Sequence, residues 1–242
     1  MVCDLVHFAH KVPTVPVQRV IDVSRLAALR EQPGWRVGWA TMFIKAFARV
    51  AAEMPELRRA YLPYPRLRLY QHPFSVASVA VERDYAGEKG VFYGRVPRPE
   101  SLGLLELEAV LNRFKTAPVE EAFRFLIHFY KLPRPLRRFI WWWVINCRGS
   151  RKAQFMGTYS VTVYSALGAE SLHPLSPATT TLNYGVIGPD GRVTVRMVYD
   201  HRVMDGGTLA RALVRLDEVL NGEIADELSE IRRAASRPPD LG

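Results

Sequence analysis

The chain has 242 residues, of which 48% are apolar and 24% are charged, and its formal net charge is +9. This balance is typical of a globular protein, and the length suits one large domain or two small ones. No run reaches the roughly 18 apolar residues of a membrane span, and the first residues lack the features of a secretory signal. Two cysteines, Cys3 and Cys147, provide neither a disulfide framework nor a zinc-ligand spacing. We therefore expect a cytoplasmic protein without a metal site.

Almost all of the net charge lies in one segment. Residues 122–156 contain eight Lys or Arg residues and no Asp or Glu, so this segment alone carries +8 of the +9. The same segment holds nine aromatic residues, including three consecutive tryptophans. Because the rest of the chain is close to neutral, the basicity argues against a general nucleic-acid-binding surface. We expect no nucleic-acid partner.

The first half of the chain alternates between extended and helical patterns. Residues 12–23 are rich in prolines and β-branched residues, which predicts extended chain. A helix is expected at residues 24–30, capped by Ser24, and a second one at residues 39–54, which ends before Pro55. The patterns that follow predict strands at 67–70, 74–81 and 91–96 and a helix at 102–114.

The second half is richer in strands. Residues 159–164 and 180–186 are β-rich runs. A strong amphipathic helix follows residues 206–207 and is expected to end at residues 221–222, an Asn-Gly pair. This mixture of helices and hairpin-like strands indicates a layered α+β domain. The intervening strand, at residues 192–199, directs one set of side chains to one side: Val193, Val195, Met197 and Tyr199.

His201 directly follows this last strand. Its imidazole has a pKa near neutrality and can take a proton from a thiol, hydroxyl or amine that attacks a carbonyl carbon. A histidine at the end of a strand is nevertheless more often structural or simply exposed. Asp205 can cap the next helix or form an ion pair, and Gly206 permits close approach of backbone or substrate. These neighbours make His201 a candidate general base.

Residues 199–206, with the sequence YDHRVMDG and an amphipathic helix behind them, resemble the signature of the catalytic domain of 2-oxoacid dehydrogenase acyltransferases. Chloramphenicol acetyltransferases share the fold and a related motif, with a second histidine where this chain has Asp200. Three further stretches are similar to the same family, at residues 11–30, 43–57 and 157–162. The resemblance implies a chloramphenicol-acetyltransferase-like two-layer α+β domain over residues 1–242, with a mixed sheet and packed helices.

The resemblance also implies the site residues. His201 corresponds to the catalytic base, supported by Asp200, Arg202 and Gly206. The family carries a Ser or Thr hydroxyl in its late strand that hydrogen-bonds the oxyanion of the tetrahedral intermediate. A match without gaps from Gly157 assigns this role to Thr162, and a shifted register would assign it to Ser160 or Ser165.

The implied reaction is direct transfer of an acyl group from acyl-CoA to an acceptor within a ternary complex. In the family the site lies between subunits of a trimer, so the resemblance implies a homotrimer whose histidine and hydroxyl come from different chains. In chloramphenicol acetyltransferases the motif's aspartate holds an N-terminal arginine. Both Lys11 and Arg19 are candidates for that partner of Asp205 here, which gives Asp205 a part in the catalytic unit.

The sequence departs from the family in two further respects. We recognise no lipoyl domain, no subunit-binding domain and therefore no covalently bound lipoyl group. The family's Gly-Leu-x-x-Pro-Val strand matches residues 90–95 poorly, which predicts an altered acceptor channel.

The basic aromatic segment at residues 122–156 looks like an insertion relative to the family, and three interpretations stay open. It can form helices that pack on the domain or trimer, with arginines that extend their charged ends to water. It can be an acyl-CoA or protein docking surface. It can also lie at a membrane interface, where cations meet anionic headgroups. In that case the contact residues are Arg137, Arg138, Trp141, Trp142 and Trp143.

The sequence therefore predicts an acyl-CoA-dependent acyltransferase with an unidentified acceptor, which works as a homotrimer in the cytoplasm, with peripheral membrane association as a further expectation. Two other functions fit the same scaffold: a non-catalytic trimeric binding protein, and a core subunit served by a separate lipoyl protein. The presence of His201, Asp205, Gly206 and Thr162 favours an enzyme over a scaffold.

Overall fold

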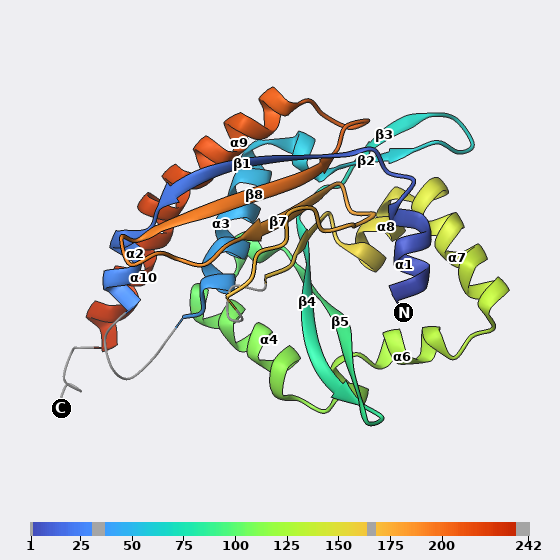
Figure 1. The fold of residues 1–242 in the computed structure, drawn as a ribbon, viewed down its shortest axis with the longest axis horizontal. Helices are drawn as coiled ribbons and strands as arrows, with labels where there is room; N and C mark the ends of the chain where they lie inside the picture. Colours follow the sequence, from blue (N-terminus) through green and yellow to red (C-terminus); the bar gives the residue numbers. More distant parts are fainter. Residues whose placement is uncertain (1, 31–36, 164–167, 236–242) are drawn as a thin grey trace.

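The computed structural model describes residues 2–30, 37–163 and 168–235. A six-stranded mixed sheet runs through the molecule in the order β1-β8-β7-β6-β4-β5 (Figure 1). The pairs β4–β6 and β6–β7 are parallel, and the other neighbours are antiparallel. The strands of this sheet are β1 (Thr14–Asp22), β4 (Val76–Tyr85), β5 (Glu88–Pro97), β6 (Tyr159–Val161), β7 (Thr180–Tyr184) and β8 (Arg192–Asp200), and a separate hairpin consists of β2 (Arg59–Leu62) and β3 (Arg68–Gln71).

A layer of amphipathic helices covers one face of the sheet. Its centre is α3, which contacts both α4 and α9. Phe43 and Phe47 of α3 are fully buried, and their rings lie 4.2 Å from the ring of Tyr184 and 4.5 Å from that of Tyr159. Burial of such side chains is the main source of stability of the layer. The helices are α2 (Ser24–Arg30), α3 (Trp39–Glu53), α4 (Leu104–Thr116), α9 (Gly206–Val219) and α10 (Ala225–Ala235).

Strand periodicity decides which side chains enter this core. In β6, Tyr159 and Val161 belong to the core cluster, so Ser160 and the next residue of that parity, Thr162, point to the opposite face. In β8 the predicted inward set is confirmed, since all four of its members are buried in the same cluster: Val193, Val195, Met197 and Tyr199.

The predicted α+β fold with a mixed sheet and packed helices is confirmed, and the predicted strands and helices recur within a few residues. One helix end is wrong. The helix after Gly206 does not stop at residues 221–222, because a π-helical turn (Leu220–Ile224) joins α9 to α10. The Asn221 side-chain amide donates to the carbonyl oxygens of Asp22 and Asp217, so this asparagine ties the turn to the end of β1.

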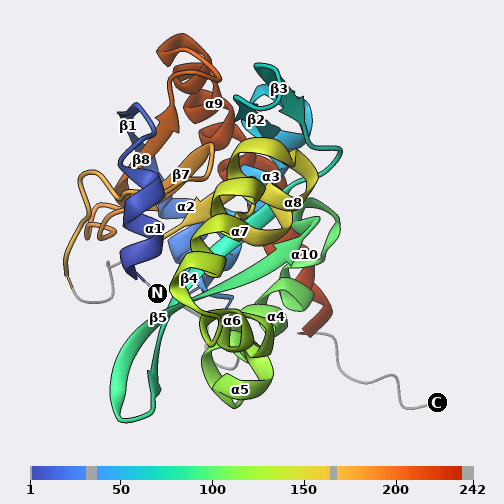
Figure 2. The same cartoon turned by 90° about the vertical axis from the view of Figure 1, so that its right-hand side faces the viewer.

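The basic aromatic segment forms helices that gather with α1 (Val2–Ala9) at the end of the molecule away from α2 and α10 (Figures 1 and 2). A buried cluster holds them together, made of Phe8, Phe129, Trp141, Ile145 and Met156. The helices are α6 (Arg124–Tyr130), α7 (Arg134–Cys147) and α8 (Gly149–Met156), preceded by α5 (Val119–Ala122). The interpretation of this segment as packed helices is therefore confirmed.

Two of the expected membrane contacts are wrong. The side chain of Trp141 is 6% exposed because it packs inside this cluster. Arg137 forms an ion pair with Asp4, a carboxylate of α1 that is 1% exposed, and Arg138 lies 3.5 Å from the same carboxylate. A buried charge needs such a partner, so Arg137 is committed to holding α1 against α7. Of the five residues, the structure leaves Trp142 and Trp143 exposed and Arg138 partly so.

Candidate active site

His201 is held in place directly after β8 by two hydrogen bonds. Its backbone N–H donates to the carbonyl of Pro13 at 3.0 Å, and its ring Nδ1 lies 3.1 Å from the carbonyl oxygen of Met204. A carbonyl oxygen only accepts, so Nδ1 carries the proton of the neutral ring and Nε2 keeps its lone pair. The residue is exposed, with the ring of Tyr199 5.5 Å away. This arrangement can accept a proton from a group that approaches from outside the chain.

Asp205 caps the helix that follows. Its carboxylate accepts a hydrogen bond from the backbone N–H of Thr208 at 2.7 Å, and α9 begins at Gly206. This hydrogen bond, with a smaller contribution from Arg211, holds the pKa of Asp205 below its usual value. The interpretation of Asp205 as a helix cap is confirmed.

One candidate partner of Asp205 from the N-terminal segment, Arg19, pairs with another carboxylate. Arg19 lies on β1 and pairs with the carboxylate of Asp217 at 3.4 Å. Within one chain the assignment of Arg19 to Asp205 is therefore wrong, because Asp217 of α9 faces β1 and takes that guanidinium.

Asp200 anchors the loop that carries His201. Its carboxylate, 2% exposed, accepts hydrogen bonds from Nε of Arg202 at 2.9 Å and from Nη2 at 2.7 Å. The guanidinium of Arg202 in turn lies 4.3 Å from the ring centroid of Tyr61, on β2. Lys152 of α8 is buried near this pair, and burial lowers its pKa to about 8, against the opposing effect of Asp200. The contact of Arg202 with Tyr61 thereby ties the loop to the β2–β3 hairpin.

Thr162 follows β6 on the face of the sheet away from the core. Its backbone N–H donates to the carbonyl of Leu182 at 3.2 Å, which fixes its position beside β7. Ser160 lies on the same face, but it is buried and its hydroxyl is 3.1 Å from that of the half-buried Ser176. The third candidate, Ser165, lies outside the described residues.

Strand register separates His201 from Thr162 within one chain. Tyr199 of β8 is paired with Thr180 of β7, which is paired with Tyr159 of β6. These three paired residues define one level across the sheet. His201 lies two residues past this level along β8, and Thr162 lies three residues past it along β6, which runs in the opposite direction to β8. Five positions correspond to about 16 Å along the strands, and two strand spacings add about 10 Å across them. The two groups do not meet in a single chain.

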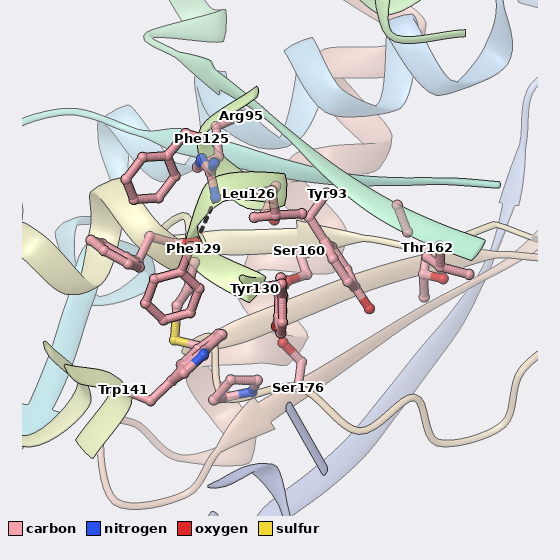
Figure 3. Close-up of a pocket in the computed structure, with 16 residues that line it drawn as sticks. Tyr93, Arg95, Phe125, Leu126, Phe129, Tyr130, Trp141, Ser160, Thr162 and Ser176 are labelled. Carbon is pink, nitrogen blue, oxygen red and sulfur yellow. Dashed lines mark hydrogen bonds between the residues drawn. The ribbon is translucent and has the colours of Figure 1, made fainter. Parts of the chain in front are cut away.

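Thr162 instead lines a cavity of about 210 Å³ between the sheet and the helices of the basic aromatic segment (Figure 3). Sequence reasoning missed most of the lining, since its members come from distant positions with no common motif. Among them, Arg95 donates to the carbonyl of Phe155 at 2.8 Å, and burial lowers the pKa of its guanidinium. Other residues that line the cavity are Ser78, Tyr93, Phe125, Leu126, Phe129, Tyr130, Trp141, Phe155, Met156, Ser160 and Ser176.

The described part of the chain offers neither a metal-binding cluster nor a helix suited to span a membrane. No group of three or more His, Cys, Asp or Glu side chains in residues 2–30, 37–163 and 168–235 could hold a metal ion. Within the same part of the chain, no helix combines the length and apolar character needed to cross a bilayer.

Comparison with known proteins identifies the fold. No protein-family model and no curated protein matches the sequence. Among solved structures, a dihydrolipoamide acetyltransferase of Azotobacter vinelandii is similar at a TM-score of 0.66 and 19% identity, over 93% of this chain and 88% of that one. A probable dihydrolipoamide acetyltransferase of Listeria monocytogenes is similar at a TM-score of 0.65 and 14% identity, over 91% and 89%. The fold is that of the dihydrolipoamide acetyltransferase cores.

A chloramphenicol acetyltransferase has the same fold, with a TM-score of 0.54 and 15% identity over 88% of this chain and 92% of that one. The predicted resemblance to the dihydrolipoamide acetyltransferase and chloramphenicol acetyltransferase fold is therefore confirmed. These alignments cover most of both partners, so the acetyltransferase-like fold extends over nearly the whole chain.

Proposed function

We propose that this protein is an acyltransferase that moves an acyl group from acyl-CoA to an acceptor, with His201 as the general base. The observation that carries the proposal is the hydrogen bond between Nδ1 of His201 and the Met204 carbonyl, which directs the lone pair of Nε2 outward. An exposed imidazole whose Nε2 is free of hydrogen bonds within the described chain, on an acyltransferase-like fold, suits proton abstraction from an acceptor. The chain acts as one catalytic domain.

In this mechanism CoA thioester and acceptor bind together. Nε2 of His201 takes the proton of the acceptor's thiol, hydroxyl or amine as that atom attacks the thioester carbonyl carbon. The hydroxyl of Thr162 donates a hydrogen bond to the oxygen that becomes negative. When the tetrahedral intermediate collapses, the carbon–sulfur bond breaks and the imidazolium returns its proton to the CoA sulfur. Asp200, Arg202 and the Asp205 cap hold the loop of His201 in place.

The proposed assembly is a homotrimer in which His201 of one subunit faces Thr162 of a neighbour. Within one chain, His201 and Thr162 are too far apart to act on the same substrate molecule. This separation supports a site that is shared between two subunits. The Azotobacter vinelandii structure was determined to investigate the catalytic roles of a serine, a histidine and an asparagine four residues after it. Here Asp205 stands four residues after His201, so the proposal gives it the equivalent supporting position.

We also propose a cytoplasmic location with peripheral membrane contact through the outer side of α7. Three of its aromatic side chains are exposed: Phe139 by 61%, Trp142 by 39% and Trp143 by 37%. Tryptophan favours the headgroup boundary of a bilayer, and the partly exposed Arg138 can meet an anionic headgroup.

The deciding experiment measures binding and turnover in His201→Ala. Wild-type protein is expected to show thermal stabilisation by CoA or acyl-CoA and release of free CoA in the presence of an acceptor panel of thiols, including dihydrolipoamide, alcohols and amines. His201→Ala is expected to keep the thermal stabilisation and to lose turnover by about 10²–10⁴-fold. His128→Ala is the matched control, because His128 is also exposed and its Nδ1 also faces a backbone carbonyl.

Absence of any stabilisation by CoA and thioesters would favour a non-catalytic scaffold. Turnover restricted to dihydrolipoamide would identify a core subunit served by a separate lipoyl protein. Equal turnover by His201→Ala and wild type would remove His201 from the reaction.

A further inference from the structure

The cavity beside Thr162 has two chemically different ends (Figure 3). At the end formed by the sheet, hydroxyl groups come from Ser78 on β4, from Ser160 on β6 and from Thr162 just after β6, and Ser176 adds another through its contact with Ser160. A thioester carbonyl is polar and suits this end. The opposite end is apolar and aromatic, with Phe125, Leu126, Phe129, Trp141, Phe155 and Met156.

All six apolar residues belong to the basic aromatic segment, on α6, α7 and α8. Half of them are held in place by packing within this chain. Phe129, Trp141 and Met156 are members of one buried cluster, and the ion pair of Arg137 with Asp4 holds α7 against α1. The segment therefore supplies a pre-formed apolar wall opposite the hydroxyl groups of the sheet.

Among the described lining residues, only Arg95 is charged. Its Nη1 donates to the carbonyl of Phe155 in the last turn of α8, and its guanidinium lies 5.8 Å from the ring centroid of Phe125. A cation at a helix C-terminus is stabilised by the carbonyl groups there. The charge of Arg95 is thus directed at the helix end, which favours an uncharged occupant for the cavity.

The volume limits the size of that occupant. The cavity measures about 210 Å³. An apolar cavity of about 150 Å³ admits benzene, so this one has room for about six to eight carbon atoms. An acetyl group would leave most of the aromatic wall without a contact, and a long fatty chain would exceed the space.

We propose that this cavity binds the acyl chain of the donor, an uncharged aliphatic or aromatic acyl group of about six to eight carbons, with its carbonyl at Thr162. The inference rests on the proposed acyltransferase function and adds the class of substrate. It gives the basic aromatic segment a role, since its helices form the part of the pocket that contacts the chain. The donor is then a medium-chain or benzoyl-type thioester rather than acetyl-CoA.

The first test is direct calorimetric titration of the wild-type protein with CoA and with acetyl-, butyryl-, hexanoyl-, octanoyl-, palmitoyl-, benzoyl- and glutaryl-CoA. Affinity is expected to rise by about fourfold for each methylene that enters the cavity, up to about eight carbons, and then to fall. Benzoyl-CoA is expected to bind more tightly than acetyl-CoA. Glutaryl-CoA, which carries a terminal carboxylate, is expected to bind more weakly than hexanoyl-CoA.

The second test shifts the preferred length of the acyl chain in both directions. Leu126→Trp fills the cavity and is expected to shift the preferred chain to fewer carbons. Phe125→Ala widens it, at a position that is already 53% exposed, and is expected to shift the preference to longer chains. Matched controls on α7 are Leu136→Trp and Leu136→Ala, at an exposed position outside the lining, and both should keep the wild-type profile.

An affinity that is the same from acetyl- to octanoyl-CoA, with CoA itself bound, would overturn the cavity assignment and leave the proposed function standing. Tighter binding of glutaryl-CoA than of hexanoyl-CoA would also overturn it, because Arg95 would then be selecting an anion. No binding of CoA or of any thioester would overturn the proposed function as well. The wild-type profile decides the matter even if the filled variant fails to fold.

Discussion

The carboxylate of Asp200 and the guanidinium of Arg202, two residues apart in sequence, form a two-point hydrogen bond with lengths of 2.9 and 2.7 Å on either side of His201. Asp200 is buried, whereas the side chain of Arg202 is 31% exposed. The pair links the residues on the two sides of His201, and the guanidinium of Arg202 lies over the ring of Tyr61. The loop that presents His201 is thus braced by residues that do not react.

Asp200→Asn is expected to destabilise the protein by about 2 kcal/mol, because it leaves the guanidinium of Arg202 without its anionic partner. Water screens only the exposed part of Arg202, so the loss stays larger than for a surface ion pair. Chemical denaturation measures the loss. Asp190→Asn is the control, since its pair with Arg192 is exposed and 4.0 Å long, and about 0.5 kcal/mol or less is expected there. Equal losses in the two variants would contradict the bracing role of Asp200.

Lys152 predicts a pH dependence of stability. Lys152 lies near Asp200 and Arg202, and burial lowers its pKa in the folded state from 10.5 to about 8. The folded protein therefore releases this proton at a lower pH than the unfolded chain. Between about pH 8 and pH 10 the unfolded state binds more protons, and the free energy of unfolding must rise with pH. The difference across the full window amounts to about 3 kcal/mol.

Thermal or chemical unfolding of wild type and Lys152→Met at pH 7.5 and pH 9.5 measures this effect. The stability difference between the two proteins is expected to move in favour of wild type as pH rises, because the variant lacks the titrating amine. Buried tyrosines contribute equally to both proteins and cancel. A difference that stays constant over this interval would show that Lys152 does not release its proton there.

The role of Thr162 is tested by Thr162→Val, which removes the hydroxyl and keeps the shape. Turnover is expected to fall by about 10²–10³-fold with little change in stability, and Thr162→Ser is expected to restore most of it. Ser160→Ala separates the competing assignment. Because the Ser160 hydroxyl is engaged with Ser176, a small effect is expected; a larger loss than in Thr162→Val would transfer the role to Ser160.

Mixing two inactive variants tests the shared site. If His201 and Thr162 act across a subunit boundary, trimers refolded from equal amounts of His201→Ala and Thr162→Val contain sites with both groups intact. Turnover is then expected to recover to about one quarter of wild type. A site built within one chain would always lack one group, and the mixture would stay inactive. Light scattering on the same samples reports whether trimers form.

Membrane contact by α7 is tested by co-sedimentation with vesicles that contain or lack anionic lipid. Wild type is expected to sediment with anionic vesicles, and the double variant Trp142→Ser with Trp143→Ser is expected to lose this, because both side chains are exposed. Phe125→Ala, on α6, is the control at another exposed aromatic position. Negligible sedimentation of wild type with either vesicle would remove the membrane from the proposal.

Local patterns in the sequence determined a large part of this structure. The alternation of β8, the helical spacing of α9 and the aspartate between them are all read from neighbouring residues, so the position of His201 at a strand end and the cap at Asp205 were predictable. The fold followed as well, because several such stretches occur in the order that the resemblance requires. These features depend on backbone periodicity and capping, which are local.

Tertiary structure decided what the basic aromatic segment does. Three consecutive tryptophans look alike in sequence, yet Trp141 is buried against Phe8 while Trp142 and Trp143 stay exposed. Arg137 is bound by Asp4, 133 residues away. The cavity beside Thr162 likewise joins strands to helices that share no motif with them. Burial and charge pairing depend on which distant groups meet, and only the folded chain brings them together.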